Sequence, residues 1–315
     1  MSKRSARRRV AFVLAALVLT LACAGVGSTA APPAFDPTKA ALELQGTAMA
    51  LQLTQAALNN AQPQAPALPA ATQGAPAAPP EPLPTPTDDL EARILSAKIL
   101  VYENTDESGI GMWIQDAIEG MGIQYTQTGS YSGHFMEYLN SGVKYDLIIV
   151  GAEDKDKISG EFWDVISGRL TRDKTALIAE VWYLDREANG PISKILGPCG
   201  VRFRVDWPLA ESIYWWEPDH PIFNEPNVVL PLLHYNRYWA NQTGDKLMLG
   251  GGGDAVMLAG LSASPSPGEG VLATCFDGRV IIQTFSDHDY RQAEVIPLWQ
   301  NYIHYTLKNH FAVAP

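Results

Sequence analysis

Cysteine, basic residues and long apolar runs are all scarce in this 315-residue chain. The three cysteines, Cys23, Cys199 and Cys275, are too few for a disulfide framework. The 23 lysines and arginines are outnumbered by 34 aspartates and glutamates, which gives a formal net charge of −11. This balance argues against nucleic acid as a partner, because phosphate binding needs clustered basic side chains. No apolar run of about 18 residues occurs, so no membrane-spanning helix is expected.

The first 22 residues have the layout of a secretory signal. Five basic side chains within positions 3–9 precede an apolar run from Val10 to Ala22, which is too short to span a bilayer. The run ends in Leu-Thr-Leu-Ala-Cys23, which resembles the lipobox of bacterial lipoproteins. The resemblance implies that residues 1–22 are removed and that Cys23 is lipidated. The protein would then be exported and lipid-anchored to the outer face of a bacterial membrane. An ordinary signal peptide with an incidental cysteine is the alternative.

Residues 23–94 are predicted to be a spacer between this anchor and a folded domain. Residues 38–60 are rich in Ala, Leu and Gln and place leucines seven apart at Leu44, Leu51 and Leu58, which predicts a solitary helix or a short coiled coil. Nine of the 23 prolines follow between Pro63 and Pro86. Such a composition cannot bury a core and favours polyproline II.

Residues 95–315 are predicted to be one α/β domain. Apolar runs typical of strands buried on both faces alternate with helical patterns, which indicates a doubly wound, mostly parallel sheet. Further strands, with Asp277-Gly278 as a two-residue hairpin turn, predict β-hairpin additions toward the C-terminus. The expected strands are 97–102, 123–126, 145–150, 175–181, 201–207, 246–249, 255–261, 270–276 and 279–285, and the expected helices are 112–121, 131–140, 161–170 and 296–309.

Three phrases resemble the class I glutamine amidotransferase-like superfamily, especially its branch of trehalose-utilisation-type proteins. They are Ala-Lys-Ile-Leu-Val-Tyr-Glu at 97–103, Asp-His-Pro-Ile-Phe at 219–223, and the run from Gly278 to His288. The likeness covers roughly residues 97–310 and implies a flavodoxin-like fold. It implies an activity less firmly, because the catalytic elbow of these enzymes is absent.

The amidotransferases use a cysteine on a strained turn between a strand and a helix, with a histidine and a glutamate downstream. Here Glu180-Val181-Trp182-Tyr183 occupies that turn, and neither Cys199 nor Cys275 restores the elbow. No Gly-x-Ser-x-Gly sequence offers a serine instead. No catalytic residue is therefore assigned. Cys199 and Cys275 either pair in an oxidising compartment or stay as buried thiols.

Polar residues at the expected strand ends are the first candidates for a site. In an open α/β sheet, ligands bind beyond the carboxyl ends of the strands. By that rule, the residues near these strand ends are expected to lie close together. They are Glu103 and Asp106 after the first strand, Glu153 after the third, Glu180 and Trp182 on the fourth, and Asp287, His288 and Asp289 after the last. Carboxylates with a histidine suit acid/base chemistry or a divalent metal. The alternative is capping of turns and solvated charge, so no metal and no cofactor is assigned.

Aromatic residues provide the second group of candidates. Trp215 stands just before the His220-Pro-Ile turn, and Tyr235 and Tyr238 follow that turn. Flat rings beside polar groups bind sugars, although such residues also serve as ordinary core. We therefore expect a non-catalytic domain that binds a carbohydrate or another envelope ligand. The alternatives are a carboxylate- or metal-dependent hydrolase and a structural module docked through the 38–60 helix. The candidate ligand-binding residues are Glu103, Asp106, Glu180, Trp182, Trp215, His220, Asp287, His288 and Asp289.

Overall fold

The structure, a computed structural model, describes residues 86–105, 109–153, 158–207, 211–236, 238 and 244–314. The expected signal, Cys23, the 38–60 helix, most of the proline-rich segment and Asp106 lie outside these residues. In the part of the chain that is described, no helix has the length and apolar character needed to cross a membrane.

One half of a ten-stranded sheet is parallel. Its strands run in the spatial order β2-β1-β3-β4-β10, and every neighbouring pair is parallel. Four of these strands are buried along their whole length, as expected from their apolar sequences. Together with the helices on both sides, this confirms the α/β class. The strands are β1 (Ile99–Asn104), β2 (Tyr125–Gln127), β3 (Leu147–Ala152), β4 (Ala176–Val181) and β10 (Val280–Gln283).

The other half of the sheet is antiparallel. It contains β9 (Gly270–Cys275), β7 (Gly244–Leu249) and β5 (Val201–Trp207), with β8 (Val256–Gly260) and β6 (Tyr214–Trp215) attached beside β9. The predicted turn between β9 and β10 is confirmed: the Arg279 N–H bonds the Phe276 carbonyl at 3.2 Å, and Asp277 and Gly278 have φ of 55° and 79°. Positive φ at both central residues is what this tight turn requires.

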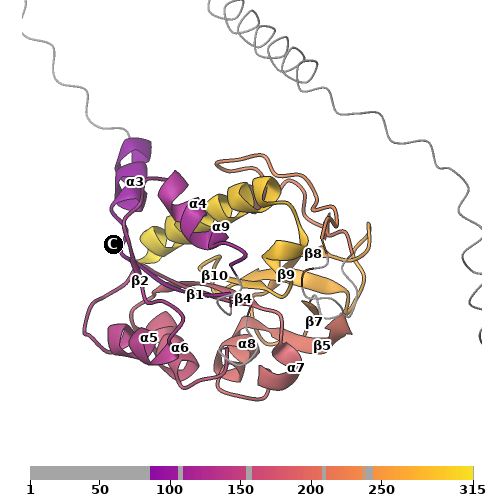
Figure 1. Cartoon of the computed structure of the whole chain (residues 1–315), viewed down its shortest axis with the longest axis horizontal. Helices are drawn as coiled ribbons and strands as arrows, with labels where there is room; N and C mark the ends of the chain where they lie inside the picture. Colours follow the sequence, from indigo (N-terminus) through magenta and orange to yellow (C-terminus); the bar gives the residue numbers. More distant parts are fainter. Residues whose placement is uncertain are drawn as a thin grey trace, which may run out of the picture. The chain divides into compact units, whose positions relative to one another are not determined.

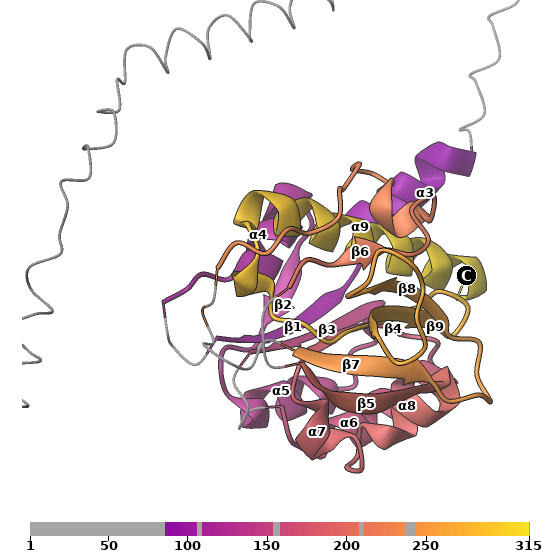
Figure 2. The same ribbon diagram turned by 90° about the vertical axis from the view of Figure 1, so that its right-hand side faces the viewer.

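Helices cover both faces of the sheet (Figure 1). One face carries α3 (Pro86–Leu95), α4 (Trp113–Gly120) and α9 (Gln292–Val313). The other carries α5 (Ser132–Leu139), α6 (Phe162–Arg172), α7 (Leu184–Glu187) and α8 (Ser193–Cys199), as the turned view in Figure 2 also shows. Side chains alternate along each strand, so β1 supplies Val101 to the core under α9 and Leu100 to the opposite core.

Helix α3 lies within the last residues of the expected spacer. It packs on α9 through Ile94, which is buried, and through the Arg93 guanidinium, 4.4 Å from the centre of the Phe311 ring. The expected start of the folded domain near Leu95 therefore falls at the end of this helix rather than at its beginning.

A disulfide joins helix α8 to the antiparallel half of the sheet. Cys199 at the end of α8 and Cys275 at the end of β9 are paired, with their Cα atoms 5.3 Å apart. The sequence left this pairing open because it cannot show the distance between two cysteines that are 76 positions apart.

Candidate functional site

A row of polar residues crosses the four central parallel strands near their carboxyl ends. Glu103, Gly151, Glu180 and Gln283 are in-register neighbours on β1, β3, β4 and β10. Because side chains alternate along a strand, this row faces the same side as the apolar residues two positions earlier, which pack beneath α4 and α9. The apolar core under these helices thus ends in a polar layer.

Gly151 provides the space in this row. A Cβ built there would lie 2.1 Å from Ile114 Cδ1 on α4 and 3.4 Å from Glu180 Oε2. Only glycine lets α4 approach the strand this closely while the Glu180 carboxyl stays beside it.

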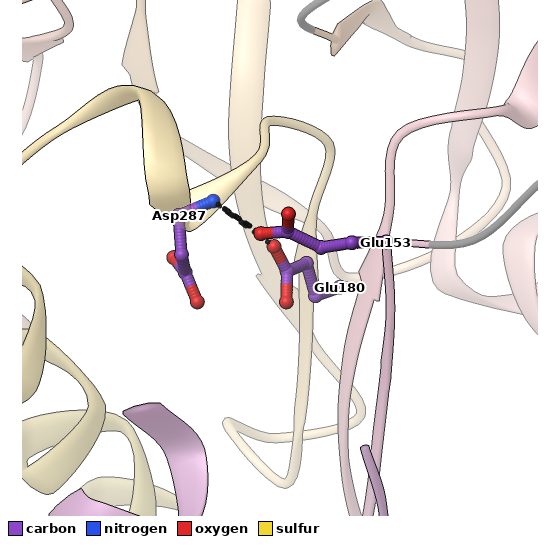
Figure 3. A group of neighbouring side chains, drawn as sticks. All are labelled: Glu153, Glu180 and Asp287. Atoms are coloured by element: carbon purple, nitrogen blue, oxygen red, sulfur yellow. Dashed lines mark hydrogen bonds between the residues drawn. The ribbon is translucent and has the colours of Figure 1, made fainter. Parts of the chain in front are cut away.

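Three buried carboxyl groups converge beside the row (Figure 3). Glu153 directly follows β3, and Asp287 opens the short 3-10 helix η3 (Asp287–Asp289). The Asp287 backbone N–H donates to Glu153 Oε1 at 3.0 Å and to Glu180 Oε1 at 3.2 Å. One oxygen from each of the three groups lies within 4.8 Å of the other two. We call Glu153, Glu180 and Asp287 the acidic triad.

The Asp287 carboxylate is fixed by two donors. Trp299 Nε1 on α9 donates to Oδ2 at 2.6 Å, and Gln283 Nε2 donates to Oδ1 at 2.8 Å. These bonds stabilise the charged form, yet burial and the neighbouring Glu153 together raise the pKa of Asp287 to about 7. Burial, followed by the charges of Asp287 and Glu153, also raises the pKa of Glu180 well above its usual range.

Glu103 differs from the triad residues, because both of its carboxylate oxygens accept hydrogen bonds from the first turn of α4. Ile114 N–H donates to Oε1 at 3.0 Å and Gln115 N–H donates to Oε2 at 3.1 Å. The N-terminal residues of α4 have no side-chain cap of their own, so a strand residue satisfies these N–H groups. Burial outweighs the two bonds and raises the pKa of Glu103 to about 8.

His288 pairs with the triad and borders solvent-accessible space. Its Nδ1 lies 2.7 Å from Glu153 Oε1, and the Trp113 ring covers it with the ring centres 4.1 Å apart. Burial disfavours the imidazolium, but the bond to Glu153 and the neighbouring carboxylates outweigh burial and raise the pKa of His288. Its Nε2 is buried and has no hydrogen-bond partner among the described residues.

A cavity of about 410 Å³ adjoins His288, and we call it the His288 cavity. Aromatic rings make up much of its wall, and polar side chains complete it. The lining residues are Ile110, Trp113, Tyr235, Asn236, Tyr238, His288, Tyr290, Arg291 and Gln292.

Asp289 accepts hydrogen bonds from the segment of Tyr235, Asn236 and Tyr238, which borders this cavity. Its backbone carbonyl accepts from the N–H groups of Tyr235 at 3.1 Å and Asn236 at 2.9 Å, and its Oδ1 accepts from Tyr238 N–H at 3.0 Å. Burial raises the pKa of Asp289 to about 7. The three residues of the Asp-His-Asp sequence therefore have different contacts. Asp287 belongs to the acidic triad, His288 lines the cavity, and Asp289 bonds the segment that forms part of the cavity wall.

Two other predicted site residues, Trp215 and His220, lie apart from this cluster. The Trp215 ring stacks on Phe223 with the ring centres 4.1 Å apart, and its Nε1 donates to the Val229 carbonyl, which is an ordinary core position. The His220 ring packs against Tyr305 and accepts from Ile222 N–H. The Tyr305 hydroxyl lies beside Gly278, at the amino end of β10 and opposite Asp287. Trp182 is buried directly after β4 against the Tyr183 ring.

The sequence analysis missed several residues of the site, among them Gln283, Trp113 and Trp299. Gln283 carried a signal, since a glutamine within an apolar strand predicts a buried polar contact. Trp113 and Trp299 carried none, because each occupies a helix position that equally suits the core.

The turn after β4 lacks the geometry of a nucleophile elbow. Among the described residues, positive φ outside glycine occurs only at Lys174, Phe276 and Asp277. Val181, Trp182 and Tyr183 thus turn into α7 without the strain that exposes a nucleophile.

No model of a protein family matches the chain. No curated protein matches it significantly.

Proposed function

We propose that the described domain binds a hydroxyl-rich ligand, such as a carbohydrate or another component of the cell envelope, in the His288 cavity. The observation that carries this proposal is the wall of the cavity, which combines aromatic rings with hydrogen-bonding side chains. Rings offer flat apolar faces to a sugar, while neighbouring amides and charged groups bond its hydroxyls.

His288 supplies a polar anchor at this wall. Glu153 occupies Nδ1, so the orientation of the His288 ring at the cavity wall is set. The Arg291 guanidinium lies 4.7 Å from the centre of the Tyr235 ring, which holds that exposed ring in place at the rim. A pre-arranged wall of this kind lowers the entropy cost of binding.

A flavodoxin-like, doubly wound fold related to the amidotransferase-like proteins is part of the proposal. The order β2-β1-β3-β4-β10 supports it, because flavodoxin-like sheets have the parallel order 2-1-3-4-5. The rule that ligands bind beyond the carboxyl ends of such strands agrees with the position of His288. The turn after β4 supports binding without a thiol nucleophile.

Export and anchoring through a lipid on Cys23 complete the proposal. The pairing of Cys199 with Cys275 supports it, since disulfides persist in oxidising compartments outside the cytoplasm. Replacing Cys23 with Ser should release the protein from the membrane fraction. Retention of that variant, together with an unmodified mass for the original chain, would remove this part of the proposal.

A carboxylate-dependent hydrolase is the second candidate, because the His288 and Glu153 pair lies beside the cavity with the proton-transfer groups acid/base chemistry needs. Incubation with any glycan that binds, followed by an assay for new reducing ends, separates the two. Product formation that is lost on replacing His288 with Gln favours the hydrolase. The structural-module alternative depends on residues 38–60, outside the described part of the chain.

The binding proposal is tested with a glycan screen and a matched pair of tyrosine variants. Tyr235 lines the cavity and Tyr131 does not, yet both are 63% exposed. Replacing Tyr235 with Ala should weaken binding about tenfold, as for a lost aromatic contact of ~1.4 kcal/mol, without lowering the melting temperature. Replacing Tyr131 with Ala should change neither. Equal effects of both variants on binding would contradict a site in this cavity.

A further inference from the structure

We infer that the acidic triad binds one hard divalent cation of the Mg²⁺ and Ca²⁺ class. The sequence analysis assigned no metal, and this inference departs from it. It does not rest on the proposed carbohydrate ligand, which would occupy the His288 cavity rather than the triad.

The first support is the spacing of the triad oxygens. Ligand oxygens lie about 2.3–2.6 Å from Ca²⁺ and about 2.0–2.1 Å from Mg²⁺, so two ligands of one ion are at most about 5 Å apart for Ca²⁺ and about 4 Å apart for Mg²⁺. One oxygen from each triad residue meets the Ca²⁺ limit with both of the others, since all lie within 4.8 Å, and a small shift of the side chains would suit Mg²⁺. Figure 3 shows the three carboxyl groups gathered around one space from three separate segments.

The second support is the charge balance around the triad. All three carboxyls are buried, and Glu180 and Asp287 form no ion pair with a lysine or arginine among the described residues. His288 contributes the nearby positive charge through Glu153. Three buried carboxylates repel one another unless protons or a cation neutralise them.

The third support is a set of buried oxygens without partners beside Asp287. Gln283 Oε1, Ser286 Oγ and Tyr302 Oη are buried and have no hydrogen-bond partner among the described residues. Gln283 Nε2 donates to Asp287 Oδ1 and Gln283 stands in register with Glu180, so the unpartnered oxygen belongs to an amide that borders the triad. Ser286 precedes Asp287, and burial, followed by the charges of Asp287 and Glu180, raises the pKa of Tyr302. The candidate ligand atoms are all oxygens, which favours a hard cation over a thiophilic one.

A second acidic group serves as the internal control. Asp185, Asp206 and Asp245 also bring their oxygens within 4.8 Å, but Asp185 and Asp206 are exposed and solvent screens their charges. Replacing Asp206 with Asn therefore removes a carboxylate from an acidic cluster without touching the triad.

The test is a titration of chelator-treated protein with Mn²⁺, in which the free ion is counted by its paramagnetic resonance signal at a temperature where every variant is folded. We expect one tightly bound Mn²⁺ per chain in the wild type and in D206N, and none in E180Q or D287N. Saturating Ca²⁺ or Mg²⁺, at about 100 times its Kd, should raise the melting temperature of the wild type by about 5–10 °C, and of E180Q not at all. A wild type that binds no Mn²⁺ and does not respond to Ca²⁺ or Mg²⁺ would overturn the inference. Equal binding by wild type and E180Q would also overturn it.

Discussion

Carboxyl groups at the two ends of the parallel strands have different partners: at the amino edge a half-buried carboxylate is paired, whereas at the carboxyl edge buried carboxyl groups lie against one another. At the amino edge, Asp146 accepts from Lys98 N–H at 2.8 Å and pairs with His310 Nε2 at 3.2 Å. These contacts outweigh desolvation, so the pKa of Asp146 is lowered. At the carboxyl edge, burial and mutual repulsion raise the pKa values of Asp287 and Glu180.

The comparison separates stability from binding within one sheet. At the amino edge Asp146 lies against two partners, and the disulfide at Cys275 lies near the same edge. The carboxyl edge retains buried carboxyls that are costly in the folded state, a pattern common at functional sites. Substitutions should therefore destabilise the protein at the amino edge, while some neutral substitutions at the carboxyl edge should stabilise it.

The largest expected effect follows from breaking the disulfide. Replacing Cys199 and Cys275 together with Ala should lower the free energy of unfolding by about 2–5 kcal/mol, because the link constrains the unfolded chain. Denaturant titration measures the loss. Binding in the His288 cavity should persist wherever the variant is folded, and a parallel loss of affinity at such a temperature would show that the two edges are not independent.

A smaller effect is expected from Asp146. Its replacement by Ala leaves the Lys98 N–H and the His310 ring without an acceptor, and should cost about 1–3 kcal/mol. Asn at this position keeps one acceptor oxygen and should recover part of the loss. The midpoints of denaturant unfolding for the two variants and the wild type measure these differences in stability. An unchanged midpoint for the Ala variant would show that the Asp146 and His310 pair does not stabilise the amino edge.

The pH dependence of stability should follow the carboxyl edge. Asp245 accepts from Leu184 N–H just beyond β4, and burial raises its pKa from 3.8 to about 8. A raised pKa means that the folded state holds the proton more tightly, so this contribution to stability is complete below pH 3.8 and is lost as the pH rises toward 8. The slope is up to about 1.4 kcal/mol per pH unit.

Replacing Asp245 with Asn isolates that contribution, because Asn keeps an oxygen for the Leu184 N–H and does not titrate. Stability curves between pH 5 and 8 should fall less steeply for this variant than for the wild type. Parallel curves would assign the pH dependence to other groups.

Site residues whose contacts follow from their position on a strand could be predicted from the sequence. Residues whose contacts depend on tertiary packing could not. Glu103, Glu180 and Asp287 were found because the carboxyl ends of parallel strands meet at one edge. Trp215 and His220 were proposed for the site but pack in the core and at the opposite edge, respectively. Their sequence context is the same for either role, since an indole or imidazole needs one polar partner in both.

Two further differences have local causes. Helix α3 was read as spacer because its sequence, Pro-Thr-Asp-Asp-Leu-Glu-Ala-Arg-Ile-Leu, continues a proline-rich segment and is stabilised mainly by packing on α9. The role of Glu103 in capping α4 could not be predicted, because it depends on a strand and a helix meeting at Gly151.

The central claim, that the carboxyl edge carries buried charge at the expense of stability, is tested most directly by replacing Glu180 with Gln. The Gln side chain keeps an acceptor for the Asp287 N–H but removes a buried carboxyl whose pKa is raised by desolvation and by its neighbours. Calorimetric melting of both proteins at pH 8, with a chelator present so that no cation contributes, compares them under one condition. The account predicts a higher melting temperature for the Gln variant. A lower one would show that Glu180 is a stabilising structural residue and would contradict the account.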